Sequence, residues 1–231
     1  MAKAGGEANL RAEADGCTRC PQLVASRSQV VFASGSIDAE LMFVGEAPGA
    51  TEDREGVPFV GASGRLLDDL LAGIGISREQ VYITNVLKCR PPDNRDPRTD
   101  EIANCFEYLE RQVELVAPTV VVTLGNFATK LLRGEDAGIT EIRGQLEERE
   151  IGARAVWLYP VFHPAAALYR RPNLELLRAD FARLPDVIKK GPPKQQAPAP
   201  KAGDPSEHDQ SVDRSPAPLA GDDGRPQLDL F

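Results

Sequence analysis

The chain has 231 residues, of which 42% are hydrophobic, and its formal net charge is −8. This length and composition allow one sizeable hydrophobic core, and the negative charge argues against a polycation that coats nucleic acid without specificity. A local group of basic side chains on an acidic body would still bind phosphates.

The end of the chain differs in composition from the rest. Residues 191–231 hold 8 of the 19 prolines and no cysteine. A segment so poor in apolar residues cannot offset the entropy cost of its own folding. We therefore expect one folded domain over residues 1–190 and a disordered tail over residues 191–231. Without the 4 basic and 7 acidic residues of that tail, the folded part keeps a net charge of −5.

The sequence contains no apolar run of membrane-spanning length, and its first residues lack the hydrophobic region of a signal peptide. We therefore expect a cytoplasmic protein, and we expect it to be monomeric. Thiols stay reduced in the cytoplasm, so the four cysteines indicate a metal site rather than disulfides.

The first two cysteines, Cys17 and Cys20, are separated by two residues, which lets both thiolates reach one centre across a tight turn. Cys89 is expected in a loop, and Cys105 on a helix whose N-cap is Thr99. The spacing of all four fits a [4Fe-4S] cluster and, on geometry alone, a zinc site almost as well.

Short apolar runs alternate with helical patterns along the chain. The predicted strands cover residues 41–44, 81–83, 119–124 and 156–162. The predicted helices cover residues 65–72, the segment from Thr99, the segment around Leu131 and a closing segment around Leu177. The charged residues 143–152 are typical of an exposed hairpin. This alternation predicts an α/β fold, a three-layer α/β/α sandwich around a mainly parallel sheet of roughly four strands.

Polar side chains follow three of the predicted strands: Glu46, Asn85 and His163. Because the carboxyl ends of parallel strands meet at one edge of a sheet, we expect these side chains to line one site. Taken singly, Asn85 is explained as a cap and His163 as a surface residue. Phe59 lies between turn residues, where its ring either stacks on a flat ligand or fills the core.

A basic rim is expected beside Asn85, in the loop that follows the second strand. It would consist of Lys88, Arg90, Arg95 and Arg98. Such a rim could bind phosphates although the whole chain is acidic.

Together these segments resemble the motifs of the uracil-DNA glycosylase superfamily, most closely its family 4 enzymes, an iron-sulfur branch. The likeness covers roughly residues 10–190, and the four cysteines are similar to the family's cluster ligands in order and spacing. The other matching segments are Gly45-Glu46-Ala47-Pro48-Gly49 for the first motif, Pro58-Phe59-Val60-Gly61 for the stacking aromatic, Thr84-Asn85 for the base-reading Asn, and His163-Pro164-Ala165-Ala166-Ala167-Leu168 for the second motif.

The resemblance implies a DNA repair enzyme that flips uracil out of single- or double-stranded DNA and hydrolyses its N-glycosidic bond, leaving an abasic site. It implies a [4Fe-4S] cluster, with zinc as the alternative, on Cys17, Cys20, Cys89 and Cys105. It implies that uracil is bound by Glu46, Ala47, Phe59, Asn85 and His163. The implied catalytic residues are Glu46, Glu52, Asn85, Asn94 and His163.

Two departures from related families bear on the mechanism. Family 1 glycosylases have a water-activating Asp in the first motif, where this chain has Glu46-Ala47. The residue that orients water or stabilises the cation is therefore left open between Glu46, Glu52 and Asn94. A branch that traps uracil covalently carries a reactive His in the loop after the second strand. No His is present in that loop here, so turnover is implied.

Flipping a base also requires a wedge and contacts to phosphates. Leu168 and Tyr169 are the predicted wedge, and Arg170 and Arg171 the predicted phosphate contacts. The simpler alternative is that Leu168 caps the core.

Two other classes of protein explain the sequence less completely than a glycosylase does. A non-catalytic, zinc-stabilised module that binds nucleic acid or nucleotides would explain the cysteines and the basic rim. It would not explain why Phe59, Asn85 and His163 share one edge. A small-molecule α/β hydrolase is disfavoured because no G-x-S-x-G motif is present.

The last five residues are more apolar than the rest of the tail. Gln227, Leu228, Leu230 and Phe231 resemble the short motif by which bacterial repair proteins bind the replicative sliding clamp. The alternative is a terminus without a partner.

Overall fold

The computed structural model describes residues 2–168 and 170–195. The predictions for Tyr169 and for the clamp-binding peptide lie outside the described residues. Among the described helices, none is both long and apolar enough to span a membrane.

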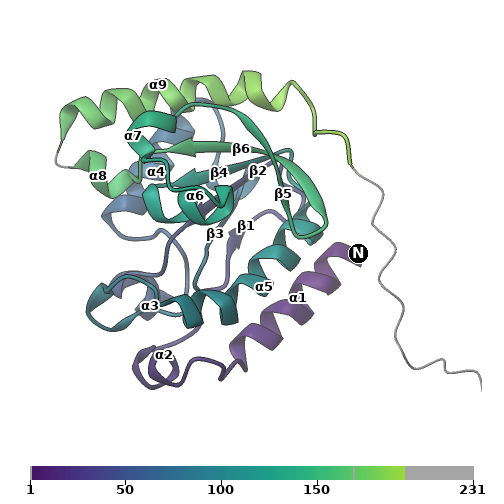
Figure 1. Cartoon of the computed structure of the whole chain (residues 1–231), viewed down its shortest axis with the longest axis vertical. Coiled ribbons are helices and arrows are strands. Elements are labelled where there is room, and N and C mark those ends of the chain that lie inside the picture. Colours follow the sequence, from purple (N-terminus) through teal and green to yellow (C-terminus); the bar gives the residue numbers. More distant parts are fainter. Residues whose placement is uncertain (1, 169, 196–231) are drawn as a thin grey trace, which may run out of the picture. The chain divides into compact units, whose positions relative to one another are not determined.

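The core of the fold is a six-stranded sheet with the order β1-β3-β2-β4-β6-β5 (Figure 1). Its strands are β1 (Ser34–Gly35), β2 (Leu41–Gly45), β3 (Tyr82–Asn85), β4 (Val120–Leu124), β5 (Glu147–Ile151) and β6 (Arg154–Val161). The four central strands run parallel, whereas β1 and β5 pair antiparallel at the two edges. The mainly parallel sheet is confirmed. The structure adds β1, which is too short to leave a pattern, and β5. The hairpin predicted within residues 143–152 is wrong in its bounds, because β5 is the only strand there and it pairs with β6.

Helices cover both faces of the sheet (Figure 1). One face carries α1 (Ala2–Asp15), α5 (Thr99–Val116) and α6 (Asn126–Arg133), and the other α4 (Ala62–Ala72), α8 (Pro164–Leu168) and α9 (Arg171–Ile188). Strand β2 shows why both faces are apolar, since Met42 and Val44 join the first core and Leu41 and Phe43 the second. The predicted three-layer α/β/α sandwich is confirmed.

The structure adds one helix to those predicted and corrects the N-cap of another. Helix α1 was not predicted, because only Leu10 and Ala14 of its residues are buried and its pattern is correspondingly weak. Helix α5 includes Thr99 as its first residue, and its N-cap is Arg98, whose backbone N–H donates to the Glu101 carboxylate over 2.9 Å. The carboxylate of the third helical residue thus closes the first turn.

The order of the strands places a crevice at the end of β2. The chain runs from β2 to β3 on one side and later returns past β2 to β4 on the other. Parallel sheets bind ligands where the winding reverses in this way. The residues after β2, β3 and β6 all reach this edge.

The ordered domain continues past the expected boundary at residue 190. The Gly191 carbonyl accepts a hydrogen bond from Trp157 Nε1 over 2.9 Å. The Gln195 side chain accepts from the Ala155 N–H over 3.2 Å and donates to the Ala155 carbonyl over 3.0 Å. These contacts attach residues 191–195 to strand β6.

A chain that ends at Lys190 should therefore be less stable than one that ends at Gln195. It loses three hydrogen bonds, each worth about 0.5–1.5 kcal/mol, which corresponds to a Tm lower by about 3–18 °C for a domain of this size. Scanning calorimetry measures the difference, and the longer chain with Gln195→Ala isolates the side-chain share. Equal melting temperatures of the two truncated chains would contradict the extended boundary.

Candidate active site

A cavity of about 440 Å³ lies at the crevice. Its lining residues are Glu46, Ala47, Gly49, Glu52, Phe59, Ser63, Asn85, Asn94, His163 and Ala165. The structure thus brings together every residue predicted to bind the base or to act in catalysis. A neighbouring cavity of about 550 Å³ shares Glu46 and His163 with it.

Asn85 is the last residue of β3 and is only 2% exposed. Its side-chain Oδ1 is buried without a hydrogen-bond partner among the described residues. Gly45 lies opposite it in the sheet, and a Cβ there would contact Asn85 Oδ1 and would lie 2.6 Å from Phe59 Cζ. A burial this costly, about 1–3 kcal/mol for an unpaired polar group, indicates that Oδ1 serves a ligand in the cavity.

The turn that carries Phe59 is held from both sides. Phe59 has a φ of 54°, a left-handed conformation that is strained for an aromatic residue. Glu52 Oε1 accepts the backbone N–H groups of Val60 at 3.1 Å and Gly61 at 2.9 Å. On the other side, Arg78 Nη1 donates to the Phe59 carbonyl over 2.9 Å. These charged partners stabilise the conformation that directs the ring into the cavity.

The Phe59 ring lies both in the core and at the cavity, so its stacking on a ligand stays a prediction. It is 6% exposed and belongs to the hydrophobic core around α4, yet it also lines the cavity. Its centroid is 5.6 Å from that of the His163 ring. The sequence did not predict Arg78, which lies in a short 3₁₀ helix remote from every motif.

His163 follows β6 and is neutral at physiological pH. Burial lowers its pKa to about 4, against the charge of Glu52, which acts to raise it. Its Nδ1 accepts a hydrogen bond from the Ala165 N–H over 3.1 Å. A neutral imidazole that accepts at Nδ1 carries its proton at Nε2, so His163 has one N–H to donate to a ligand.

The remaining polar residues of the cavity, Glu46, Glu52 and Asn94, differ in burial and in how many of their oxygens already accept hydrogen bonds. The half-buried Glu46 has a raised pKa, chiefly because of burial and secondarily because of the charge of Asp96. Asn94 is exposed, with a φ of 53°, and its Oδ1 accepts from Arg90 Nε over 2.8 Å. Glu52 already uses one oxygen for backbone amides, so its second oxygen alone is left for other partners.

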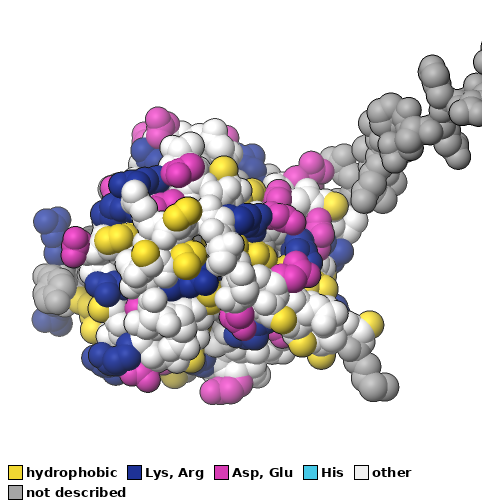
Figure 2. Space-filling view, turned by 90° about the horizontal axis from the view of Figure 1, so that it is seen from below, with side chains coloured by type: hydrophobic (Ala, Val, Ile, Leu, Met, Phe, Trp, Pro, Cys, Tyr) yellow, Lys and Arg dark blue, Asp and Glu magenta, His cyan; other side chains and the backbone are white. Residues whose placement is uncertain are grey.

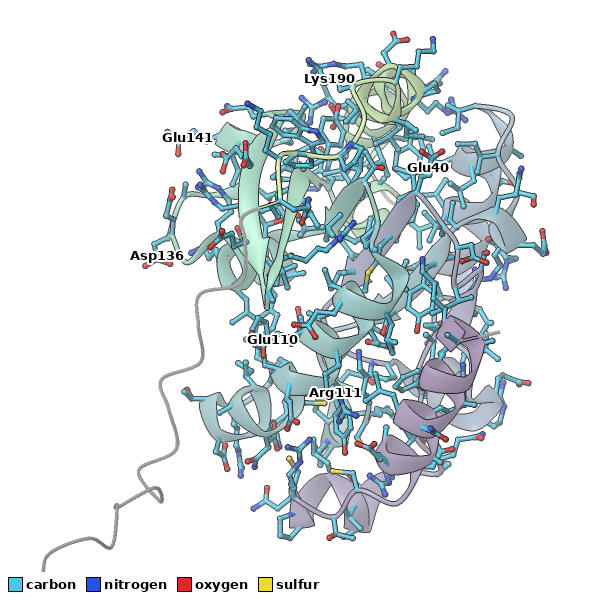
Figure 3. All side chains as sticks on the ribbon, turned by 90° about the vertical axis from the view of Figure 1, so that its right-hand side faces the viewer. Glu40, Glu110, Arg111, Asp136, Glu141 and Lys190 are labelled. Atoms are coloured by element: carbon cyan, nitrogen blue, oxygen red, sulfur yellow. The ribbon has the colours of Figure 1, made fainter. Side chains whose placement is uncertain are left out.

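The four cysteines lie in one region, and none of them is in a disulfide. Cys17 and Cys20 stand between α1 and α2 (Pro21–Ser26), Cys89 in the loop after β3, and Cys105 on α5. Burial raises the pKa of the Cys89 thiol, and the charges of Cys17 and Cys20 raise it further. In Figure 3, sulfur atoms gather at this end of the molecule, below the labelled Arg111.

N–H groups surround these sulfur atoms. Arg27 Nη1 donates to Cys89 Sγ over 3.1 Å, the Lys88 backbone N–H to Cys105 Sγ over 3.3 Å, and Asn104 Nδ2 to Cys20 Sγ over 3.6 Å. Such donors suit sulfur ligands that carry negative charge. In the described residues, no group of three or more His, Cys, Asp or Glu side chains is placed so that it could hold a metal ion.

The predicted basic rim is wrong for Lys88. This side chain is fully buried at 1% exposure, because its ammonium finds three acceptors inside the protein. Arg95 is paired with Glu101, and Arg98 donates to Gln22 Oε1 over 2.6 Å. Figure 2 shows Lys and Arg side chains next to Asp and Glu side chains over one face, rather than in one basic patch.

Of the predicted wedge, only Leu168 is among the described residues, and it lies at the surface. Leu168, the last residue of α8, is 38% exposed, so it does not cap the core. Arg170 and Arg171 are exposed as well.

Comparison with known proteins places this site in a family. The family model of the Uracil DNA glycosylase superfamily matches residues 32–184. The type-4 uracil-DNA glycosylase of Sulfurisphaera tokodaii is 45% identical over 184 residues, which cover 77% of this chain and 83% of the relative. Those of Archaeoglobus fulgidus and Thermotoga maritima are 44% and 43% identical, covering 77% and 75% of this chain and 90% of each relative. The chain therefore belongs to the uracil-DNA glycosylase superfamily and, within it, to the type-4 enzymes.

Proposed function

We propose that this protein is a DNA repair glycosylase that flips uracil out of DNA and hydrolyses its N-glycosidic bond, leaving an abasic site. The observation that carries the proposal is the buried Asn85 amide, which has an unpaired Oδ1 beside Phe59 and His163. The named activity of the type-4 relatives supports it. A non-catalytic zinc-stabilised module is not favoured, because it needs no such cavity.

Uracil presents an N–H donor between two carbonyl acceptors. The Asn85 amide can accept from that N–H through Oδ1 and donate to the adjacent O4 through Nδ2, while the Phe59 ring stacks on the base. Cytosine has an amino donor in place of O4 and an unprotonated ring nitrogen. A fixed Asn85 amide therefore discriminates against cytosine, and Gly45 leaves the room that this geometry needs.

Breaking the glycosidic bond leaves negative charge on the base and positive charge on the sugar. The Nε2–H of neutral His163 donates to the carbonyl oxygen where the negative charge accumulates. Half-buried Glu46 supplies a carboxylate near the sugar, and its raised pKa suits a group that takes a proton from water. Asn94 is the second candidate for orienting that water, and Glu52 acts mainly on the Phe59 turn.

We further propose that Cys17, Cys20, Cys89 and Cys105 hold a [4Fe-4S] cluster, with a zinc ion as the alternative. The donor set has the right chemistry, since all four thiols are free and three of them, Cys20, Cys89 and Cys105, receive N–H hydrogen bonds from their surroundings. When bound, such a group cross-links the segment before α2, the loop after β3 and helix α5. Its role is structural.

Contacts with DNA and other partners remain proposals that the motifs support. Leu168, with Tyr169, would fill the vacated base stack, and Arg170 and Arg171 would hold phosphates. The peptide that includes Gln227 and Phe231 would bind the sliding clamp. Cytoplasmic location and a monomeric state stay expectations from the sequence.

The proposed activity predicts strand scission. Incubating the protein with an oligonucleotide that contains one uracil, followed by alkali, should cleave the strand at that position. Asn85→Asp should lower kcat/KM about 100-fold or more, because a carboxylate cannot donate to O4. Asn9→Asp, an exposed change of the same kind on α1, should leave the rate unchanged. Full activity and selectivity in Asn85→Asp would refute the assignment.

The neutral state of His163 predicts its titration. The side chain should stay uncharged throughout pH 5.5–8 and take up a proton only near pH 4, because burial disfavours the imidazolium. Nitrogen-15 NMR of the imidazole over this pH range, with the signal assigned by its loss in His163→Gln, measures this directly. Since the folded pKa lies below the unfolded value of about 6.5, stability present above pH 6.5 is lost progressively toward pH 4. A midpoint near 6.5 would contradict a buried neutral donor.

The proposed cluster predicts colour and composition. The purified protein should be brown, with about four iron and four sulfide per chain, whereas a zinc site would give a colourless protein with about one zinc. Cys17→Ser should lose iron and lower both Tm and the excision rate. A colourless Cys17→Ser variant that stays folded and fully active would exclude the structural role.

A further inference from the structure

Lys88 is a buried cation that the mechanism above does not use. Its side chain is 1% exposed, and it lies outside the lining of the active-site cavity. Within the described part of the chain, no Asp or Glu pairs with it. Lysine is almost never fully buried unless it is paired, so the position needs an explanation.

The ammonium group uses all three of its donors inside the protein. Nζ donates to Thr84 Oγ1 over 2.8 Å, to the Asn85 backbone carbonyl over 2.6 Å, and to Gln112 Oε1 over 2.6 Å. An ammonium has three N–H donors, so this set saturates it and fixes its position.

The acceptors are themselves fixed. Gln112, on helix α5, donates through Nε2 to the Phe32 carbonyl over 3.3 Å and to Tyr82 Oη over 3.2 Å. The Thr84 hydroxyl donates to the same Phe32 carbonyl over 2.7 Å. The lysine therefore joins the end of β3 to helix α5 through a network whose members all have partners.

The backbone of Lys88 connects the end of β3 to the cysteine region. Its N–H donates to Cys105 Sγ over 3.3 Å, and its carbonyl accepts from the Val31 N–H over 2.8 Å. One residue thus contacts the cysteine region through its backbone and the Asn85 carbonyl through its side chain. Asn85 has no hydrogen bond at Oδ1 that could hold its amide in place.

We propose that Lys88 is a positioning residue that holds the Asn85 backbone from behind, so that the amide meets the base in one orientation and the cysteine region supports that orientation. The inference rests on the proposed uracil excision and names a residue on which its selectivity depends. Lys88 touches neither the base nor the sugar.

The test replaces Lys88 with Met in the full chain. Lys88→Met keeps most of the length of the side chain but leaves three buried acceptors without the donor Nζ. The excision rate at saturating DNA should fall about tenfold, and the inhibition constant of free uracil should rise about tenfold. The KM for DNA should change less than twofold, because contacts with phosphates lie elsewhere. The iron content should stay that of the unchanged protein.

A matched control separates positioning from loss of stability. Arg133 is a cation of 8% exposure, which donates to Glu147 over 2.8 and 3.0 Å between α6 and β5. Arg133→Met should lower Tm by about as much as Lys88→Met does. It should leave the excision rate and the uracil inhibition constant within about twofold of the unchanged protein. Equal losses in both variants would overturn the proposal, as would wild-type values in Lys88→Met.

Hydrogen exchange tests the proposal without any activity. The Val86 and Leu87 N–H groups donate to the Gly45 and Glu46 carbonyls over 2.9 and 3.0 Å. They should exchange about tenfold or more faster in Lys88→Met than in Arg133→Met. Unchanged exchange would overturn the proposal even if the enzyme excised no uracil, whereas absent excision by the unchanged protein would overturn the proposed function alone.

A second variant covers the case in which Lys88→Met fails to fold. Gln112→Leu removes one of the three acceptors and leaves the bond from Nζ to the Asn85 carbonyl possible. It should lower the excision rate, raise the inhibition constant of free uracil and speed amide exchange at Val86 and Leu87, each by a smaller factor than Lys88→Met. Gln112→Glu, which keeps an acceptor for Nζ, should restore them toward those of the unchanged protein. If neither variant moves uracil inhibition or amide exchange, the proposal is wrong.

Discussion

The register between β2 and β3 is the constraint on which the site depends. It sets Gly45 beside Asn85, and the pairing continues past the strands, where the Val86 and Leu87 N–H groups donate to the next two carbonyls of the neighbouring segment. A slip by one residue would turn Asn85 to the opposite face of the sheet. Because position 45 carries no side chain, the Phe59 ring and the Asn85 amide occupy the space beside it.

Arginines that pair with other groups of this chain are not available to bind DNA phosphates. The chain is acidic overall, and several arginines close to the cavity hold loops instead of facing solvent. Arg78 binds Asp68 and the Phe59 turn, and Arg95 binds the buried Glu101. Arg170 and Arg171, by contrast, are exposed, as the proposed contacts with phosphates require.

The sequence predicts well what depends on local pattern. Continuous apolar runs mark the four parallel strands, and the polar residues that follow them, including Asn85 and His163, mark the site. Lys88 was misplaced because a lysine in a polar loop is normally exposed, and only its three tertiary acceptors explain its burial. The hydrogen bonds that Glu52 and Arg78 make with the Phe59 turn could not be predicted either, because they join backbone atoms to side chains remote in the sequence.

The loop between β3 and α5 links the cysteine region to the cavity. It contains only one short 3₁₀ helix (Pro92–Asn94), and two of its residues, Asp93 and Asn94, have positive φ. Ordering such a segment is costly in entropy, so it must be anchored at both ends. Lys88 and Cys89 anchor its start, and Glu101 anchors its end by accepting from Arg95 and from the Arg98 N–H. Asn94 reaches the cavity from between these anchors. The shape of this loop is therefore the physical connection between the cysteine region and the cavity.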